Sequence, residues 1–109
     1  TRTWNHSNQF LIYIIDELNL AGIPDDDICI VFAQGSHRAQ TPEEDVRVCG
    51  EEVIRRIKTY QHDCMDPTLV DCGTTKLGTP LKLNKHFVDA DKVIIVDGIT
   101  THLFAGYGG

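Results

Sequence analysis

The sequence lacks any long hydrophobic run and any excess of positive charge. No apolar stretch approaches the roughly 20 residues that a membrane span requires, and no signal-peptide pattern is visible. Ten basic residues stand against 16 acidic ones, which gives a formal net charge of −6. Non-specific nucleic-acid binding needs basic patches that displace counterions, and this balance argues against them. We therefore expect neither a membrane nor a nucleic acid as a partner.

The sequence also lacks motifs for structural zinc, for dithiol redox chemistry and for binding nucleoside triphosphates. The four cysteines contain no Cys-x-x-Cys pair, which leaves a zinc ribbon or thioredoxin-type site with little support. Cys29 lies in an apolar run, where we expect a small buried side chain, and the simplest interpretation is reduced thiols in a cytoplasmic protein. The stretch Gly73–Gly78 lacks the Gly-Lys-Ser/Thr ending of a phosphate-binding Walker loop.

What remains is the composition of a globular protein of 109 residues, with 41% hydrophobic and 24% charged residues. Hydrophobic periodicity and helix-capping residues predict alternating helices and strands. Thr41 can cap a helix, with Pro42 at its first position and Glu44 closing a capping box. The expected elements are a helix over 7–21, a strand over 28–33, a helix over 42–57 interrupted at Gly50, a strand over 58–62, two short strands within 69–84, a brief helix after Asn84, and a buried strand over 92–96.

This order predicts an α/β fold, Rossmann-like, with a largely parallel sheet and helices on both faces. We expect residues 1–109 to be part of one such domain and the domain to be incomplete. The chain ends in the glycine-rich turn Gly106–Gly109, and such a turn is useful between two ordered segments.

Two histidines follow the expected buried strands. His37 lies in a short polar loop after the strand 28–33, and His102 lies a few residues past the strand 92–96. Ligand sites of parallel sheets lie at the carboxyl ends of the strands, so both are candidates for one site. The alternative for His37 is a structural hydrogen bond to a backbone carbonyl in its loop.

The other candidates have open alternatives. His62 followed by Asp63 could be an oriented acid–base pair or part of a solvated turn. Arg38 could bind an anion, or could support its loop by pairing with Glu43 or Glu44. His6 and His86 are expected at the surface, outside any site.

At these positions the chain resembles a known family. Gly35–Glu44 is similar to the Gly-x-His-Arg segment of the nickel-pincer-nucleotide lactate racemase family, and His102–Gly109 to its His-x-Phe-Ala-Gly-aromatic-Ser-Gly-Gly motif. Thr1-Arg2 resembles the end of an Asp-x-Thr-Arg motif. One departure is Gly108, where the family has serine. Weaker matches fall between the two strong motifs in the expected order: His62-Asp63, Gly73–Pro80, Asn84-Lys85 and Ala90-Asp91.

The resemblance implies a racemase or epimerase that interconverts stereoisomers of lactate or a related 2-hydroxy acid by hydride transfer to a nickel-pincer nucleotide. His37 and His102 match the two histidines that take the hydroxyl proton, one for each enantiomer, and Arg2 matches the arginine that holds the substrate. Imidazole titrates near neutral pH, and an arginine fork fits a carboxylate. The lysine that carries the cofactor and the nickel-binding histidine are expected outside this chain.

The implied partners are therefore a small 2-hydroxy acid and the remainder of the parent protein, and the fragment alone is expected to be inactive. Two alternatives stay open. The chain could be a non-catalytic α/β module that binds a hydroxy acid or a nucleotide, or an unrelated α/β domain whose histidine loops resemble the family by coincidence.

Overall fold

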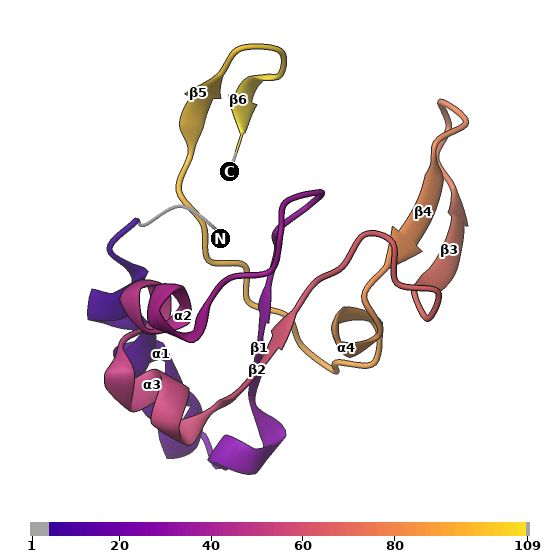
Figure 1. Cartoon of the computed structure of the whole chain (residues 1–109). Coiled ribbons are helices and arrows are strands. Elements are labelled where there is room, and N and C mark those ends of the chain that lie inside the picture. Colours follow the sequence, from indigo (N-terminus) through magenta and orange to yellow (C-terminus); the bar gives the residue numbers. More distant parts are fainter. Residues whose placement is uncertain (1–4, 109) are drawn as a thin grey trace.

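Helices and short strands alternate along the chain in a mixed α/β arrangement (Figure 1). The structure is a computed structural model, and it describes residues 5–108. No helix within this part of the chain is long and apolar enough to cross a membrane. The elements are α1 (Ser7–Leu20), the 3₁₀ helix η1 (Asp25–Asp27), β1 (Cys29–Phe32), α2 (Pro42–Cys49), α3 (Glu51–Arg56), β2 (Lys58–Gln61), β3 (Val70–Thr74), β4 (Pro80–Leu83), α4 (Lys85–Val88), β5 (Thr100–His102) and β6 (Gly106–Gly108).

A parallel pair of strands forms the centre of the fold. β1 and β2 run in register from Cys29 opposite Lys58 to Phe32 opposite Gln61, and α2 and α3 connect them. Both helices fall in the predicted segment 42–57. They are separated at Gly50, whose φ of 89° and ψ of 150° leave the helical region. The predicted interruption is thus confirmed.

The hydrophobic core lies between α1, α2, α3 and the strand β1. Its buried side chains come from residues spread between positions 15 and 57, and the hydroxyl of Ser7, itself buried, donates to the carbonyl of Val48 at 2.7 Å. This bond ties the start of α1 to the end of α2. The core residues are Ile15, Phe32, Val48, Cys49, Val53 and Ile57.

The remaining strands form two antiparallel hairpins, β3–β4 and β5–β6. Both project away from the helices and the parallel pair (Figure 1). The hairpin around Gly73–Gly78 and the brief helix α4, capped by the Asn84 side chain accepting from the His86 amide at 2.9 Å, confirm the corresponding predictions. No residue from 62 to 108 is fully buried.

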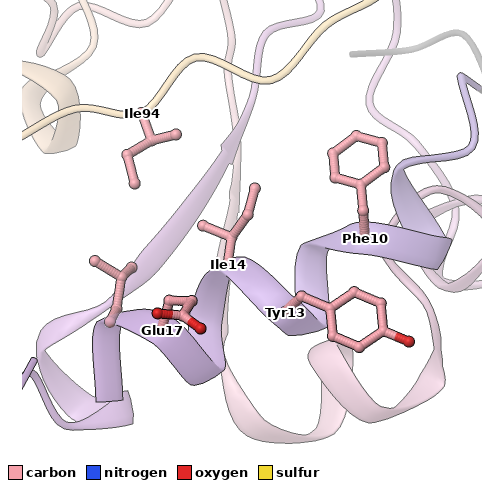
Figure 2. Close-up of a pocket in the computed structure, with 6 residues that line it drawn as sticks. Phe10, Tyr13, Ile14, Glu17 and Ile94 are labelled. Carbon is pink, nitrogen blue, oxygen red and sulfur yellow. The ribbon is translucent and has the colours of Figure 1, made fainter. Parts of the chain in front are cut away.

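The predicted strand over 92–96 is wrong. Lys92–Val96 has no strand structure, and Ile95 is 83% exposed. An apolar run forms a strand only when a neighbouring strand satisfies its backbone N–H and C=O groups. Here the run passes over α1, where Ile94 borders an apolar groove lined by one face of that helix (Figure 2). The other lining residues are Phe10, Tyr13, Ile14, Glu17 and Leu18.

The expected Rossmann-like, largely parallel sheet is therefore not confirmed. Residues 5–108 form three two-stranded sheets, of which one is parallel. For the same reason the expectation of a buried strand over 28–33, with Cys29 buried in it, is wrong for β1: only Phe32 is buried, and Cys29 is exposed. With a single strand neighbour, β1 leaves its first residue uncovered.

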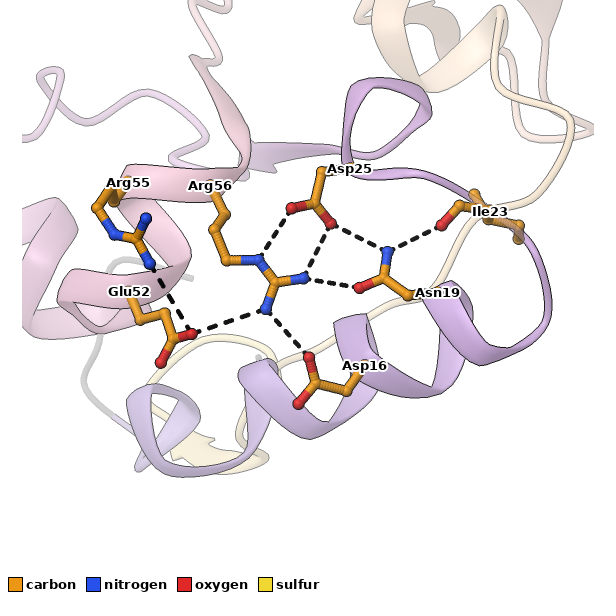
Figure 3. A network of polar contacts seen from close by, with 7 residues as sticks. All are labelled: Asp16, Asn19, Ile23, Asp25, Glu52, Arg55 and Arg56. Atoms are coloured by element: carbon orange, nitrogen blue, oxygen red, sulfur yellow. Dashed lines mark hydrogen bonds and ion pairs between the residues drawn. The ribbon is translucent and has the colours of Figure 1, made fainter.

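A polar cluster around Arg56 joins α3 to α1 and η1 (Figure 3). The guanidinium donates twice to Asp25, through Nε and Nη2 at 2.9 Å each, and also to Asn19 at 2.7 Å and Asp16 at 3.0 Å. The Arg56 side chain is 19% exposed. Its planar fork reaches partners on two elements at once, which a lysine would not do.

Candidate functional site

The loop between β1 and α2 presents His37. Gly35 begins the turn with a φ of 58°, in the left-handed region that favours glycine. The backbone N–H of His37 donates to the carbonyl of Gln34 at 3.1 Å. The His37 imidazole is exposed, and within residues 5–108 it has no hydrogen-bond partner. The structural alternative, a ring bonded to a loop carbonyl, is therefore not seen in this part of the chain.

Arg38 supports the loop, which is the second of the two interpretations given above. Its Nη1 and Nη2 donate to the two carboxylate oxygens of Glu44 at 2.8 and 2.7 Å. Glu44 also accepts from the Thr41 amide at 2.9 Å, and the Thr41 hydroxyl accepts from the Glu44 amide, so the predicted capping box is confirmed. Glu44 thus fixes Arg38 while it caps α2.

A cluster of amide side chains under the loop was not predicted. The Gln61 Nε2 donates to both carboxylate oxygens of Asp45 at 3.0 Å. Its Oε1 accepts from the backbone N–H of Gln40 at 3.2 Å and contacts the amide of Gln34, which is 2% exposed. Burial raises the pKa of Asp45. These bonds fasten both ends of the His37 loop to Gln61 of β2, which in turn is bound to Asp45 of α2.

A signal for this cluster was present in the sequence. Gln34 directly follows the apolar run of β1, and Gln61 closes β2, so both polar side chains stand at the carboxyl ends of parallel strands. The same argument that singled out His37 applies to them.

His102, the last residue of β5, lies on the second glycine turn. Its Nδ1 accepts from the backbone N–H groups of Phe104 and Ala105, both at 3.2 Å. The imidazole is exposed, and the Phe104 ring lies 6.2 Å from it, tilted by 54°. A Cβ at Gly108 would lie 3.8 Å from the His102 Cβ, an ordinary contact. Position 108 therefore has space for the Cβ atom of a side chain.

The structure places the two histidine segments at the same end of the molecule without joining them. In Figure 1 the β1–α2 loop and the β5–β6 hairpin both extend beyond the carboxyl end of β1. Within residues 5–108, no hydrogen bond or ring contact links His37 to His102. Arg2 lies outside the described residues.

The other sequence candidates have structural roles. The His62 amide donates to the Phe32 carbonyl at 3.2 Å. The Asp63 carboxylate accepts from the Met65 amide at 2.8 Å, which is the solvated-turn alternative. The exposed ring of His86 stacks on Tyr60 with centroids 3.6 Å apart. Residues 5–108 contain no group of three His, Cys, Asp or Glu side chains that could hold a metal ion.

These features define an α/β domain with one exposed histidine on the β1–α2 loop and another at the end of β5. The sequence model of the lactate racemase N-terminal domain matches residues 1–109, and the chain belongs to this family. The expected family membership is thus confirmed.

Two curated relatives are similar to this chain. The lactate racemase of Lactiplantibacillus plantarum is 34% identical over 87 residues, which are 79% of this chain and 20% of that protein. The lactate racemase of Thermoanaerobacterium thermosaccharolyticum is 31% identical over 84 residues, or 76% of this chain and 20% of that protein. The chain therefore spans about a fifth of the length of these relatives.

Proposed function

We propose that the full-length protein interconverts the stereoisomers of lactate or of a related 2-hydroxy acid. Family membership and two relatives named lactate racemase support this activity. The observation that carries the proposal is the His37 imidazole, exposed and without a hydrogen-bond partner in residues 5–108 on a loop that Gln61 and Glu44 fasten. A general base needs such a free nitrogen on a fixed backbone.

In this proposal His37 and His102 each accept the hydroxyl proton of one enantiomer. Two bases are needed because the enantiomers present their hydroxyl groups in different directions. A positioned general base typically contributes about 10²–10⁴-fold to the rate. Arg2, which lies outside the described residues, would bind the substrate carboxylate through its guanidinium.

The proposed cofactor is a nickel-pincer nucleotide, which supplies a hydride acceptor for the α-carbon of the substrate when it is bound. The donor set of residues 5–108 does not fit the metal of this group, because these residues contain no cluster able to hold an ion. The attachment lysine and the nickel-binding histidine are assigned to residues outside this chain. The proposal for residues 5–108 is therefore limited to proton transfer.

We further propose that the complete domain has the Rossmann-like, largely parallel sheet with helices on both faces. Parallel strands occur mostly in sheets that are covered on both faces, whereas Cys29 at the start of β1 is exposed here. A structure of the full-length protein in which β1 or β2 pairs with a further parallel strand would support this. The cytoplasmic location also remains a proposal, supported by the four free thiols.

The experiment is racemase activity of the full-length protein against a panel of 2-hydroxy acids, starting from each pure enantiomer. We expect His37→Ala and His102→Ala to lower the rate by about 10²-fold or more, without loss of folded protein, since both side chains are exposed. His86→Ala, which removes an exposed histidine away from these loops, is the matched control.

Two outcomes would count against the proposal. If both variants unfold but keep normal activity per folded molecule, the histidines are structural. If the protein binds a 2-hydroxy acid and turns over none of the panel, the non-catalytic binding module is the better interpretation.

A further inference from the structure

The two candidate bases differ in how the chain holds their rings. The His102 Nδ1 lies 3.2 Å from the amide nitrogens of both Phe104 and Ala105. A backbone N–H can only donate, so the Nδ1 lone pair accepts both bonds and carries no proton. The proton of the neutral ring then sits on Nε2, because the bond made by one ring nitrogen determines the state of the other.

The turn holds the two amides in this position. Residues His102 and Gly106 face each other in the β5–β6 register. Gly106 has a φ of 75°, in the left-handed region, and the Tyr107 amide donates to the Ala105 carbonyl at 2.9 Å. The chain therefore doubles back directly after His102 and brings the Phe104 and Ala105 amides onto its ring.

We propose that this turn acts as a latch that holds the His102 ring in one tautomer. The last step of the proposal, the role of His102 toward a substrate, rests on the proposed racemase function. While the latch is closed, Nε2 already carries a proton and Nδ1 is covered by two N–H donors. The ring has no lone pair left for a substrate proton. Latched His102 binds a substrate oxygen as a hydrogen-bond donor, and it becomes a base only after its ring leaves the two amides.

His37 has no such latch within residues 5–108, where its imidazole makes no hydrogen bond. Either of its ring nitrogens can carry the proton, so it can accept a substrate proton without rearrangement. The two histidines are thus unequal: His37 is the ready base, and His102 is the residue whose role the backbone amides of Phe104 and Ala105 control.

The test uses the full-length protein labelled with ¹⁵N, at a pH well above the usual imidazole pKa of about 6.5. Long-range ¹H–¹⁵N spectra report which ring nitrogen is protonated, and single His→Gln variants assign the signals. We expect His102 to show one localised tautomer with the proton on Nε2, and a scalar coupling across the hydrogen bond between its Nδ1 and the amide nitrogens of Phe104 and Ala105. His37 serves as the internal reference, with nitrogen shifts averaged between tautomers.

Two variants sharpen the result. Ala105→Pro removes one of the two N–H donors and should move the His102 shifts toward those of His37, whereas Phe104→Ala keeps both amides and should leave them unchanged. Averaged shifts or a protonated Nδ1 at His102 in the unmodified protein would overturn the latch, even if the protein is an active racemase. A localised Nε2 proton with both couplings in a protein that racemises nothing would support the latch and refute the proposed function.

Discussion

The Asp25 carboxylate receives three hydrogen bonds, two from Arg56 and one from Asn19. The hydrogen bond from Arg56, followed by that from Asn19, lowers the pKa of Asp25 from 3.8 to about 2. A carboxyl group whose pKa is lower in the folded than in the unfolded state stabilises the fold at any pH above its unfolded-state pKa. This contribution is lost as the pH falls toward the folded-state pKa.

The free energy of unfolding should therefore depend on Asp25 in a defined pH window. We expect the difference between the unmodified protein and Asp25→Asn to be constant above about pH 4 and to shrink between about pH 4 and pH 2. Urea titrations at a series of pH values measure it. Asp26→Asn is the matched control, since the Asp26 carboxylate has no hydrogen bond or ion pair in residues 5–108. A difference that grows on acidification would contradict the argument.

Gly50 is a second residue that the fold requires, because of its backbone conformation. Its φ of 89° with ψ of 150° lies in a region reached essentially by glycine alone, and an added Cβ would lie 3.2 Å from the Asn8 carbonyl oxygen. Gly50→Ala should therefore destabilise the protein by about 1–3 kcal/mol. Gly78→Ala, with a φ of 83° and open space around the added Cβ, should cost less. Chemical denaturation measures the free energy of unfolding of each variant. Equal losses would show that the contact with the Asn8 carbonyl adds nothing to the destabilisation at position 50.

At the scale of residues, the sequence was a reliable guide where the chemistry is local. The capping box and the Gly50 break depend on neighbouring residues, and both are confirmed. The burial of Cys29 depends on which strand lies beside β1, and that prediction is wrong. The site roles of His37, His102 and Arg2 remain predictions.

At the scale of elements, the contact between β2 and α2 fixes the His37 loop. Gln61→Leu would remove the amide donor from the Asp45 carboxylate, whose pKa burial already raises. We expect a loss of about 1–3 kcal/mol in the free energy of unfolding. Repeating the substitution in an Asp45→Ala background completes a double-mutant cycle, in which we expect a coupling of about 0.5–3 kcal/mol. Additive losses would show that the Gln61–Asp45 bonds contribute nothing of their own.

Periodicity and capping predicted the segments that form α1, β1, α2, α3, β2, β3, β4 and α4, because these elements carry their signals locally. The run Lys92–Val96 has the same apolar pattern as β1 but forms no strand. An apolar pattern indicates that a segment favours an extended, buried conformation. It does not indicate which strand is present to pair with that segment.

At the scale of the whole molecule, the cysteines distinguish the core from the rest. Cys49 is 1% exposed, and burial, followed by the charge of Asp45, raises its pKa to about 11. Cys29, Cys64 and Cys72 are exposed. We expect thiol reagents to modify Cys64 and Cys72 quickly and Cys49 only when the core opens, since the thiolate is the reactive species. Mass spectrometry over time measures this, and rapid labelling of Cys49 under native conditions would contradict the described core.

In residues 5–108 the core side chains are grouped between Ile15 and Ile57, and this also has a consequence for biosynthesis. The N-terminal part of a chain leaves the ribosome first. Asp16, Asn19 and Asp25 therefore emerge well before Arg56, the residue that joins them. Once β2 has emerged, every buried side chain from Ser7 onward is available. We expect the segment from Ser7 to Gln61 to fold during translation, before the two hairpins, because residues 62–108 contribute no buried side chain.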